Sequence, residues 1–171
     1  MDTGLEVDRY RIDKRGPDRS PLRIPGAPVL HMRKITDQAF VVLCWFAGQP
    51  DDTVATARAV AEATGIPQPT VAKLLKKLAR GDVLVSTRGL CGGYSLARAP
   101  ERIPLTHVIA ACEGPLGLTD CTIPGTPACD DHGTCAVAPH WQVISRAIVS
   151  TLEGITLAEL TGSPTRLAAA L

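Results

Sequence analysis

Two short helical patterns joined by a glycine turn constrain the fold of this chain more than any other feature. Small and apolar residues recur at helical spacing from Val54 to Thr64, and Gly65 follows at a position where helices often end. A second pattern opens at Pro69, a residue suited to the first helical position, and closes at Gly81. Two helices joined by a short turn that contains glycine predict a helix-turn-helix.

A β-hairpin is predicted directly after these helices. Val83 to Thr87 is a β-prone run, the stretch from Arg88 to Gly93 is rich in glycine, and Tyr94 to Leu96 predicts the return strand. An additional helix is expected before them, with Thr36 as its N-cap and an end at Gly48. We therefore expect a mainly α fold, a winged helix-turn-helix with three helices and a β-hairpin wing.

The sequence beyond the wing predicts more helix and one long loop. Helices are expected over Leu105 to Cys112 and over Ala136 to Glu153, with a loop at 114–134 between them. Thr156 and Glu159 have the spacing of a capping box for a short final helix. The long helix carries an apolar stripe at heptad-like spacing, which indicates a dimerisation helix or packing within its own subunit. The stripe consists of Val137, Trp141, Ile144, Ile148 and Leu152.

Composition divides the chain into four expected parts. Residues 1–31 hold four prolines and no apolar period, so we expect a disordered tail, and residues 161–171 a flexible one. Residues 32–100 form the expected DNA-binding domain, with nine basic and five acidic side chains. Residues 101–160 hold the cysteine loop and dimerisation helix, and 101–171 carry three basic and seven acidic side chains. This asymmetry fits a nucleic-acid-binding half with a control segment, although uneven surface charge explains it equally well.

Several function classes are disfavoured by the sequence. No run of about 18 apolar residues is present, and the N-terminus lacks the apolar region of a signal peptide, so we expect a cytoplasmic protein without a membrane span. No acid–base pair, nucleophile motif or phosphate-binding glycine loop stands out, so we expect neither an enzyme nor a small-molecule substrate. Six cysteines are many for a reducing compartment, which raises metal, cluster or redox roles.

The second helix of the motif carries the side chains that we expect near DNA bases. Gln68, Thr70 and Lys73 lie toward its N-terminal end. In the major groove of double-stranded DNA, Gln can bond adenine through two hydrogen bonds, and Lys can reach the acceptors of guanine. The alternative is that the lysines of this helix form an ordinary solvated face.

Further cations are candidates for the DNA backbone. Lys76 and Lys77 follow on the same helix, together with Arg80, and basic side chains at these positions suit phosphate contacts. Arg88, near the tip of the hairpin, suits the minor groove or its flanking phosphates. These positions predict an interface made by the helix and the wing together.

Three cysteines lie in or beside the long loop. Seven residues separate Cys121 from Cys129, and five separate Cys129 from Cys135. This spacing is not typical of zinc, whose structural sites usually use close cysteine pairs. The residues alone are compatible with free thiols, a metal or cluster site, or a disulfide. Among metal sites, soft thiolates favour an iron–sulfur cluster over a hard cation.

Four stretches of the chain carry motifs that occur together in known regulators. They are Met32 to Asp37, Val85 to Tyr94, Cys112 to Cys121 and Trp141 to Leu160. Their order and spacing resemble the IscR/NsrR family of dimeric winged-helix transcription regulators. The resemblance extends from Met32 to Leu160 and is closest to the bacterial branch that regulates the SUF iron–sulfur assembly operon.

The resemblance implies an iron–sulfur cluster on Cys121, Cys129 and Cys135, with [2Fe–2S] favoured over [4Fe–4S]. It also implies candidates for a further ligand. Asp37 matches the position where, in nitric-oxide-sensing relatives, a carboxylate from the opposite subunit completes the site. His140 lies two residues beyond the position where some relatives carry a histidine, which here is alanine. His132 and Cys112 are the other candidates.

The function implied by the resemblance is that of a homodimeric repressor. It would bind a double-stranded DNA operator and control iron–sulfur assembly genes according to whether a labile cluster is bound. The alternative is a nitric-oxide-sensing or redox-sensing repressor of the same fold, which uses a [4Fe–4S] cluster or free thiols.

Overall fold

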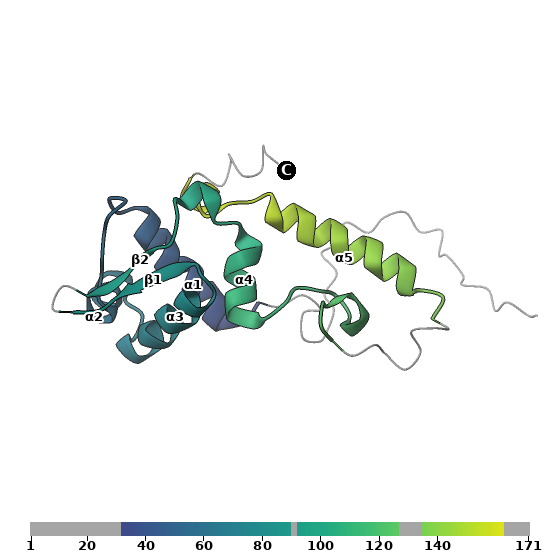
Figure 1. Cartoon of the computed structure of the whole chain (residues 1–171), viewed down its shortest axis with the longest axis horizontal. Helices are drawn as coiled ribbons and strands as arrows, with labels where there is room; N and C mark the ends of the chain where they lie inside the picture. The colour runs from purple at the N-terminus through teal and green to yellow at the C-terminus, as the bar shows by residue number, and fades with distance from the viewer. Residues whose placement is uncertain (1–31, 90–91, 127–134, 163–171) are drawn as a thin grey trace, which may run out of the picture. The chain divides into compact units, whose positions relative to one another are not determined.

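The computed structural model describes residues 32–89, 92–126 and 135–162, which all belong to one compact unit that begins at Met32. Figure 1 shows their helices and strands. The tail at 1–31, Leu90, Cys91, and the segments 127–134 and 163–171 lie outside the described residues. The elements are α1 (Lys34–Ala47), α2 (Ala57–Thr64), α3 (Gln68–Arg80), β1 (Leu84–Thr87), β2 (Gly93–Leu96), η1 (Pro100–Arg102), α4 (Leu105–Glu113), η2 (Asp120–Thr122), α5 (Ala138–Glu153) and α6 (Leu157–Thr161).

The helix-turn-helix consists of α2 and α3. Gly65 ends α2 with a φ of 71°, a left-handed conformation that favours glycine over residues with a Cβ. The buried face of α3 is the predicted one, with Val71, Leu74, Leu75 and Leu78 all fully buried. Their spacing leaves the opposite face of α3 to its polar side chains.

The second helix begins later than predicted, at Ala57 instead of Val54. The hydroxyl oxygen of Thr56 caps it by accepting a hydrogen bond from the Ala59 N–H. Ala55 is in extended conformation because its backbone pairs with Tyr94 through N–O distances of 2.8 and 2.9 Å. This long-range pairing excludes the residues before Thr56 from the helix.

The wing is the antiparallel pair β1 and β2, in which Leu84 lies opposite Leu96 and Thr87 opposite Gly93. Leu84 is buried against the helices, whereas the rest of β1 is exposed. Gly93 lies so close to the backbone of Ala55 that a Cβ at position 93 would be 2.6 Å from the Ala55 carbonyl oxygen. The mainly α winged-helix prediction is therefore confirmed.

One hydrophobic core joins the winged helix to the sequence beyond it. Ile103, Val108, Cys112 and Leu157 are buried in the same cluster as the core residues of α1 and α3. The helix α6, which carries Leu157, has the predicted capping box between Thr156 and Glu159. Thus α4 and α6 are integral parts of the winged-helix core.

Helix α1 begins at Lys34, so the prediction that Thr36 is its N-cap was wrong. Thr36 lies inside the first turn and is completely buried. Its hydroxyl donates a hydrogen bond to the carboxylate of Glu113, 77 residues further along the chain. The sequence around Thr36 does not predict this distant partner.

Helix α5 starts at Ala138, two residues after the predicted position, and ends at Gly154 as expected. Its buried residues are Ala138 and Ser145, whereas Val137, Trp141 and Ile144 of the predicted stripe are 39–54% exposed. Ile148 and Leu152, at the other end of the stripe, are half-buried, and Leu152 packs against Leu105, Ile109 and Ile155. Within the described residues, only the N-terminal part of the stripe is therefore left uncovered by its own subunit. None of the described helices is long and apolar enough to span a membrane.

Candidate DNA interface and cysteine loop

The residues predicted to contact bases lie at the N-terminal end of α3. Gln68 and Lys73 are exposed, and Thr70 is half-buried. Pro67 precedes the helix with extended backbone, and Gly65 sets the turn that delivers the chain into α3. Because Val71 and Leu74 anchor the other side of the helix, these three polar side chains lie on a face that a DNA groove can approach.

The lysines further along α3 have different environments. Lys76 is exposed, as expected for a phosphate-binding side chain. Lys77 is half-buried, and its ammonium donates a 2.7 Å hydrogen bond to the carbonyl oxygen of Cys112 on α4. Lys77 was predicted to contact phosphate as Lys76 does, but in this structure its charge is directed at the C-terminal turn of a neighbouring helix. Such a position is favourable for a cation.

Arg88 is the cation of the wing. It follows β1 directly and is exposed. Leu90 and Cys91, the next part of the hairpin tip, lie outside the described residues. An exposed arginine at this place can reach a phosphate or a narrow minor groove beside the groove that α3 would occupy.

The first part of the cysteine loop is attached to α5. Cys121 lies in η2, and its sulfur is 3.2 Å from the hydroxyl oxygen of Thr119. The Gln142 side chain of α5 donates a 2.6 Å hydrogen bond to the carbonyl oxygen of Cys121. The Leu118 N–H contacts the buried Ser145 hydroxyl at 3.4 Å. Two polar side chains of α5 therefore fix the backbone that carries the Cys121 thiol.

Cys135 lies at the other side of the loop, next to the start of α5, and is half-buried like Cys121. Cys129 and His132 are within 127–134, outside the described residues. In the parts of the chain that the structure describes, no three His, Cys, Asp or Glu side chains are grouped closely enough to hold a metal ion. The described residues thus supply two of the three predicted thiols.

The other predicted ligands differ in accessibility. Asp37, in the first turn of α1, and His140, in the first turn of α5, are both exposed. Cys112 is buried, and desolvation raises the pKa of its thiol. Burial also raises the pKa of the Cys44 thiol. Since metal ligation requires the thiolate, Cys112 is a poor candidate ligand in this structure.

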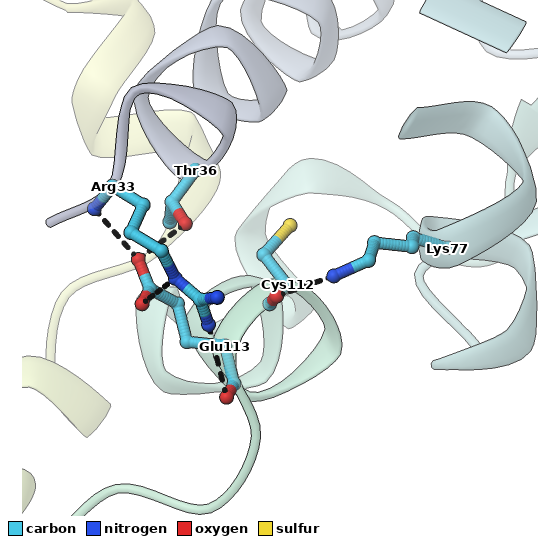
Figure 2. A network of polar contacts seen from close by, with 5 residues as sticks. All are labelled: Arg33, Thr36, Lys77, Cys112 and Glu113. Atoms are coloured by element: carbon cyan, nitrogen blue, oxygen red, sulfur yellow. Dashed lines mark hydrogen bonds and ion pairs between the residues drawn. The ribbon is translucent and has the colours of Figure 1, made fainter. Parts of the chain in front are cut away.

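Glu113 is the centre of a polar network that the sequence analysis did not assign (Figure 2). Its carboxylate accepts hydrogen bonds from the Thr36 hydroxyl at 2.5 Å and from the Arg33 backbone N–H and Nε at 2.9 and 2.8 Å. The Thr36 hydrogen bond and those from Arg33 lower the pKa of Glu113 from 4.5 to about 2. The sequence contained one indication of this network. Glu113 lies at the C-terminus of a predicted helix, where a negative charge interacts unfavourably with the helix dipole unless it has a specific partner.

The last turn of α4 therefore contacts two other helices. Through Glu113 it holds the N-terminus of α1, and through the carbonyl of Cys112 it holds Lys77 of α3. Gly114 follows immediately and begins the segment that leads to Cys121.

Comparisons with known proteins agree with this architecture. The family model Rrf2, described as an iron-dependent transcriptional regulator, matches residues 32–163. A putative HTH-type transcriptional regulator of Synechocystis is 37% identical over 112 residues, which are 66% of this chain and 74% of that protein. The regulator IscR of Aliivibrio salmonicida is 33% identical over 101 residues, 59% of each protein. NsrR of Oceanobacillus iheyensis is 29% identical over 134 residues, 77% of this chain and 89% of NsrR.

Solved structures show the same fold at lower identity. The global cysteine regulator CymR of B. subtilis matches with a TM-score of 0.59 and 20% identity, over 77% of this chain and 96% of CymR. IscR of T. potens matches with a TM-score of 0.56 and 22% identity, over 83% of this chain and 89% of that chain. At these identities the likeness establishes the fold only.

Proposed function

From the premise that the chain belongs to the Rrf2 family of transcriptional regulators, a non-enzymatic family of DNA-binding proteins, we propose that it is a repressor of iron–sulfur assembly genes. Its DNA affinity would depend on a labile [2Fe–2S] cluster held by Cys121, Cys129 and Cys135. The observation that carries this proposal is the cysteine loop, attached to α5 through Gln142 and continuous with the turn of α4 that touches α3.

The proposed DNA contacts are made by α3 and the wing. Gln68, Thr70 and Lys73 would approach base edges in the major groove, because they lie on the exposed side of α3. Lys76 would contact a phosphate, and Arg88 the minor groove or its edge. Lys77 has no direct role in this account, since it is hydrogen-bonded to Cys112.

The donor set fits an iron–sulfur cluster. Thiolates are the ligands that iron–sulfur clusters use, and Cys121 and Cys135 are both partly accessible. Among contacts between described residues, the hydrogen bond of Cys121 with Thr119 is the one that involves either thiol. When bound, the cluster supplies a group whose occupancy changes with iron supply and oxidants. Asp37 and His140 are the proposed sources of a non-thiolate ligand, with Asp37 coming from the opposite subunit.

The chain is proposed to act as a homodimer through α5. Val137, Trp141 and Ile144 leave a stripe of apolar side chains exposed, and Val143 is 65% exposed beside it. Contiguous apolar surface of this kind marks interaction sites, and two copies of the same helix pair naturally about a twofold axis. Such a dimer would present two copies of α3 to two half-sites of DNA.

The proposed coupling passes through the end of α4. Gain or loss of the cluster would change the position of the loop from Gly114 to Cys121, and Glu113 and Cys112 at its start hold α1 and α3. The two arrangements of the dimer would then have different DNA affinity, which is the condition for any ligand to switch an equilibrium. The form with the cluster would repress, and loss of the cluster would relieve repression.

A reporter experiment tests this function. A promoter bound by the protein is fused to a reporter, and expression is followed with and without an iron chelator. The triple variant C121A/C129A/C135A should fold and bind DNA. Reporter expression in cells that carry it should no longer change with iron. The control variant Cys44→Ala removes a thiol outside the loop and should retain regulation. Regulation by iron that persists in the triple variant would reject the cluster proposal.

A further inference from the structure

A cleft of about 290 Å³ lies between the C-terminal half of α3 and the wing. Its lining residues are Lys76, Ala79 and Arg80 from α3, and Ser86 and Tyr94 from the two strands. A water molecule takes about 30 Å³ of liquid volume, so the cleft has room for several waters or for one small anionic group with part of its hydration. None of the lining residues is acidic.

The helix contributes two cations on the same side. Lys76 and Arg80 are four residues apart, a spacing that makes side chains neighbours on a helix surface, and both are exposed. Like charges at this spacing destabilise an isolated helix slightly. Among the described residues, neither side chain forms an ion pair that would offset this repulsion. Their arrangement is therefore more favourable when an anion lies between them.

The wing contributes two hydroxyls from the opposite wall. Ser86 of β1 and Tyr94 of β2 are directly paired across the hairpin, so their side chains lie on the same face of the sheet. Tyr94 is held in place by its two backbone hydrogen bonds to Ala55. Within the described residues, neither hydroxyl has a protein hydrogen-bond partner, so both are available to an acceptor from outside.

The small side chain of Ala79 leaves the cleft open between these walls. Ala79 is half-buried and packs against the core, and a larger residue there would occupy the space between Arg80 and Tyr94. The open cleft thus combines two exposed cations, two hydroxyl donors and the small apolar side chain of Ala79. A phosphate oxygen accepts hydrogen bonds from all of these donors.

We propose that this cleft holds one phosphodiester group of the bound DNA, with Lys76 and Arg80 on one side and Ser86 and Tyr94 on the other. The inference rests on the proposed DNA surface of α3 and Arg88. It adds Ser86 and Tyr94 to that surface and gives Lys76 and Arg80 one shared phosphate. A single phosphate held by helix and wing together fixes the register of the protein on the duplex, because phosphate contacts position and base contacts specify.

Binding to a fluorescein-labelled 30-base-pair duplex of random sequence tests the proposal without knowledge of an operator. Affinity is measured by anisotropy between 50 and 250 mM salt. Loss of one phosphate contact should reduce the slope of log K against log salt by about 0.9 and weaken binding about eightfold at 0.1 M salt. Lys76→Gln and Arg80→Gln should each approach this loss. Arg102→Gln, which removes an equal charge from η1 outside the cleft, should change the slope much less.

Two substitutions that leave the charge unchanged distinguish the loss of contacts in the cleft from the loss of general electrostatic attraction to DNA. Tyr94→Phe removes only a hydroxyl, and Ala79→Leu fills the space without changing charge. Both should weaken binding severalfold, while thermal unfolding shows that each variant is folded. Because Tyr94 and Arg80 would contact the same phosphate, the double variant should lose less than the product of the two single losses.

A competition experiment distinguishes a phosphate group of DNA from free phosphate as the occupant of the cleft. At equal ionic strength, inorganic phosphate and chloride should compete with DNA to the same extent if the cleft requires the geometry of a duplex. Inorganic phosphate that raises the thermal unfolding temperature of wild type but not of Arg80→Gln, while Arg80→Gln and Tyr94→Phe leave DNA affinity unchanged, would instead identify a site for free phosphate and would overturn the proposal.

The remaining outcomes distinguish the cleft from the whole surface. If Lys73→Gln and Arg88→Gln weaken binding while Tyr94→Phe and Ala79→Leu leave it unchanged, the cleft proposal fails and the proposed DNA surface survives. If none of the variants alters affinity or salt slope, the proposed surface itself is wrong.

Discussion

The ammonium of Lys77 donates a 2.7 Å hydrogen bond to the carbonyl oxygen of Cys112, 35 residues further along the chain. This bond joins α3, the helix proposed to contact DNA, to the last turn of α4 (Figure 2). Glu113, the next residue, accepts hydrogen bonds from Arg33 and Thr36 of the α1 end. The loop that carries Cys121 begins directly after this turn. The last turn of α4 therefore contacts α3 and leads directly into the cysteine loop.

Substitution of Lys77 should weaken both stability and coupling. Lys77→Met removes a charged donor from a carbonyl at a helix end, which should lower the free energy of unfolding by about 1–2 kcal/mol in urea titrations. It should also reduce the difference in DNA affinity between the forms with and without cluster by about 0.5–2 kcal/mol. The matched control is Lys76→Met on the exposed side of α3, which should change stability by less than about 0.5 kcal/mol. Equal effects of the two substitutions would contradict the role given to Lys77.

The network of Glu113 should make stability depend on acid pH. The folded-state pKa of Glu113 is lowered from 4.5 to about 2, so the ionised form is favoured by folding. Its contribution is present above about pH 4.5 and is lost as the pH falls toward 2. Because Arg33 is 60% exposed, we expect roughly 1–2 kcal/mol instead of the full value of the shift.

Unfolding of cluster-free protein by urea between pH 6 and pH 3 measures this contribution. The difference between wild type and Glu113→Gln should be largest at pH 6 and should shrink as the pH falls. Thr36→Val removes the principal hydrogen-bond donor to Glu113 and should raise the Glu113 pKa. The variant should therefore lose stability at a higher pH than wild type does. A difference that does not vary with pH would show that the network contributes by packing alone.

Base-contacting and backbone-contacting residues should behave differently in DNA binding. Lys73→Ala and Arg88→Ala should each cost about 1–3 kcal/mol on an operator selected from genomic fragments, with a smaller loss on random DNA. Lys76→Ala should weaken both DNAs alike and reduce the salt slope by about 1. Uniform effects of all three on selected and random DNA would mean that none of them contributes to sequence recognition.

The apolar stripe of α5 should control the oligomeric state. Trp141→Glu places a charge in the exposed stripe and should convert a dimer at micromolar concentration into a folded monomer, as measured by sedimentation velocity. Ser150→Glu adds the same charge at an exposed position of α5 outside the stripe and should leave the dimer intact. A wild-type protein that sediments as a monomer would refute the dimer proposal before any variant is made.

Local signals predicted most of the fold. The apolar spacing in α3, Gly65 with its positive φ, and the capping box of Thr156 and Glu159 were identified because each depends on residues a few positions apart. The start of α2 was placed too early because Ala55 is held by Tyr94, far away in sequence. A single sequence contains no local trace of such pairing.

The candidate site was predictable in its residue types but not in its connections. The helical spacing of Lys77 is that of a lysine on the exposed face of α3. Its side chain contacts Cys112 because α4 packs beside it. Thr36 resembles an N-cap, yet its hydroxyl is used by Glu113. Both partners lie dozens of residues away, so helical periodicity could not identify them.

The most direct test of the central claim is an anaerobic absorption spectrum of the freshly purified protein, with iron and acid-labile sulfide assayed on the same sample. A protein with a [2Fe–2S] cluster should show visible sulfur-to-iron charge-transfer bands and contain two iron and two sulfide per subunit, all lost in C121A/C129A/C135A. Four iron per subunit would instead favour the [4Fe–4S] alternative. A colourless protein that contains no iron after anaerobic reconstitution would contradict the account and leave a winged-helix regulator whose loop cysteines respond to something other than a cluster.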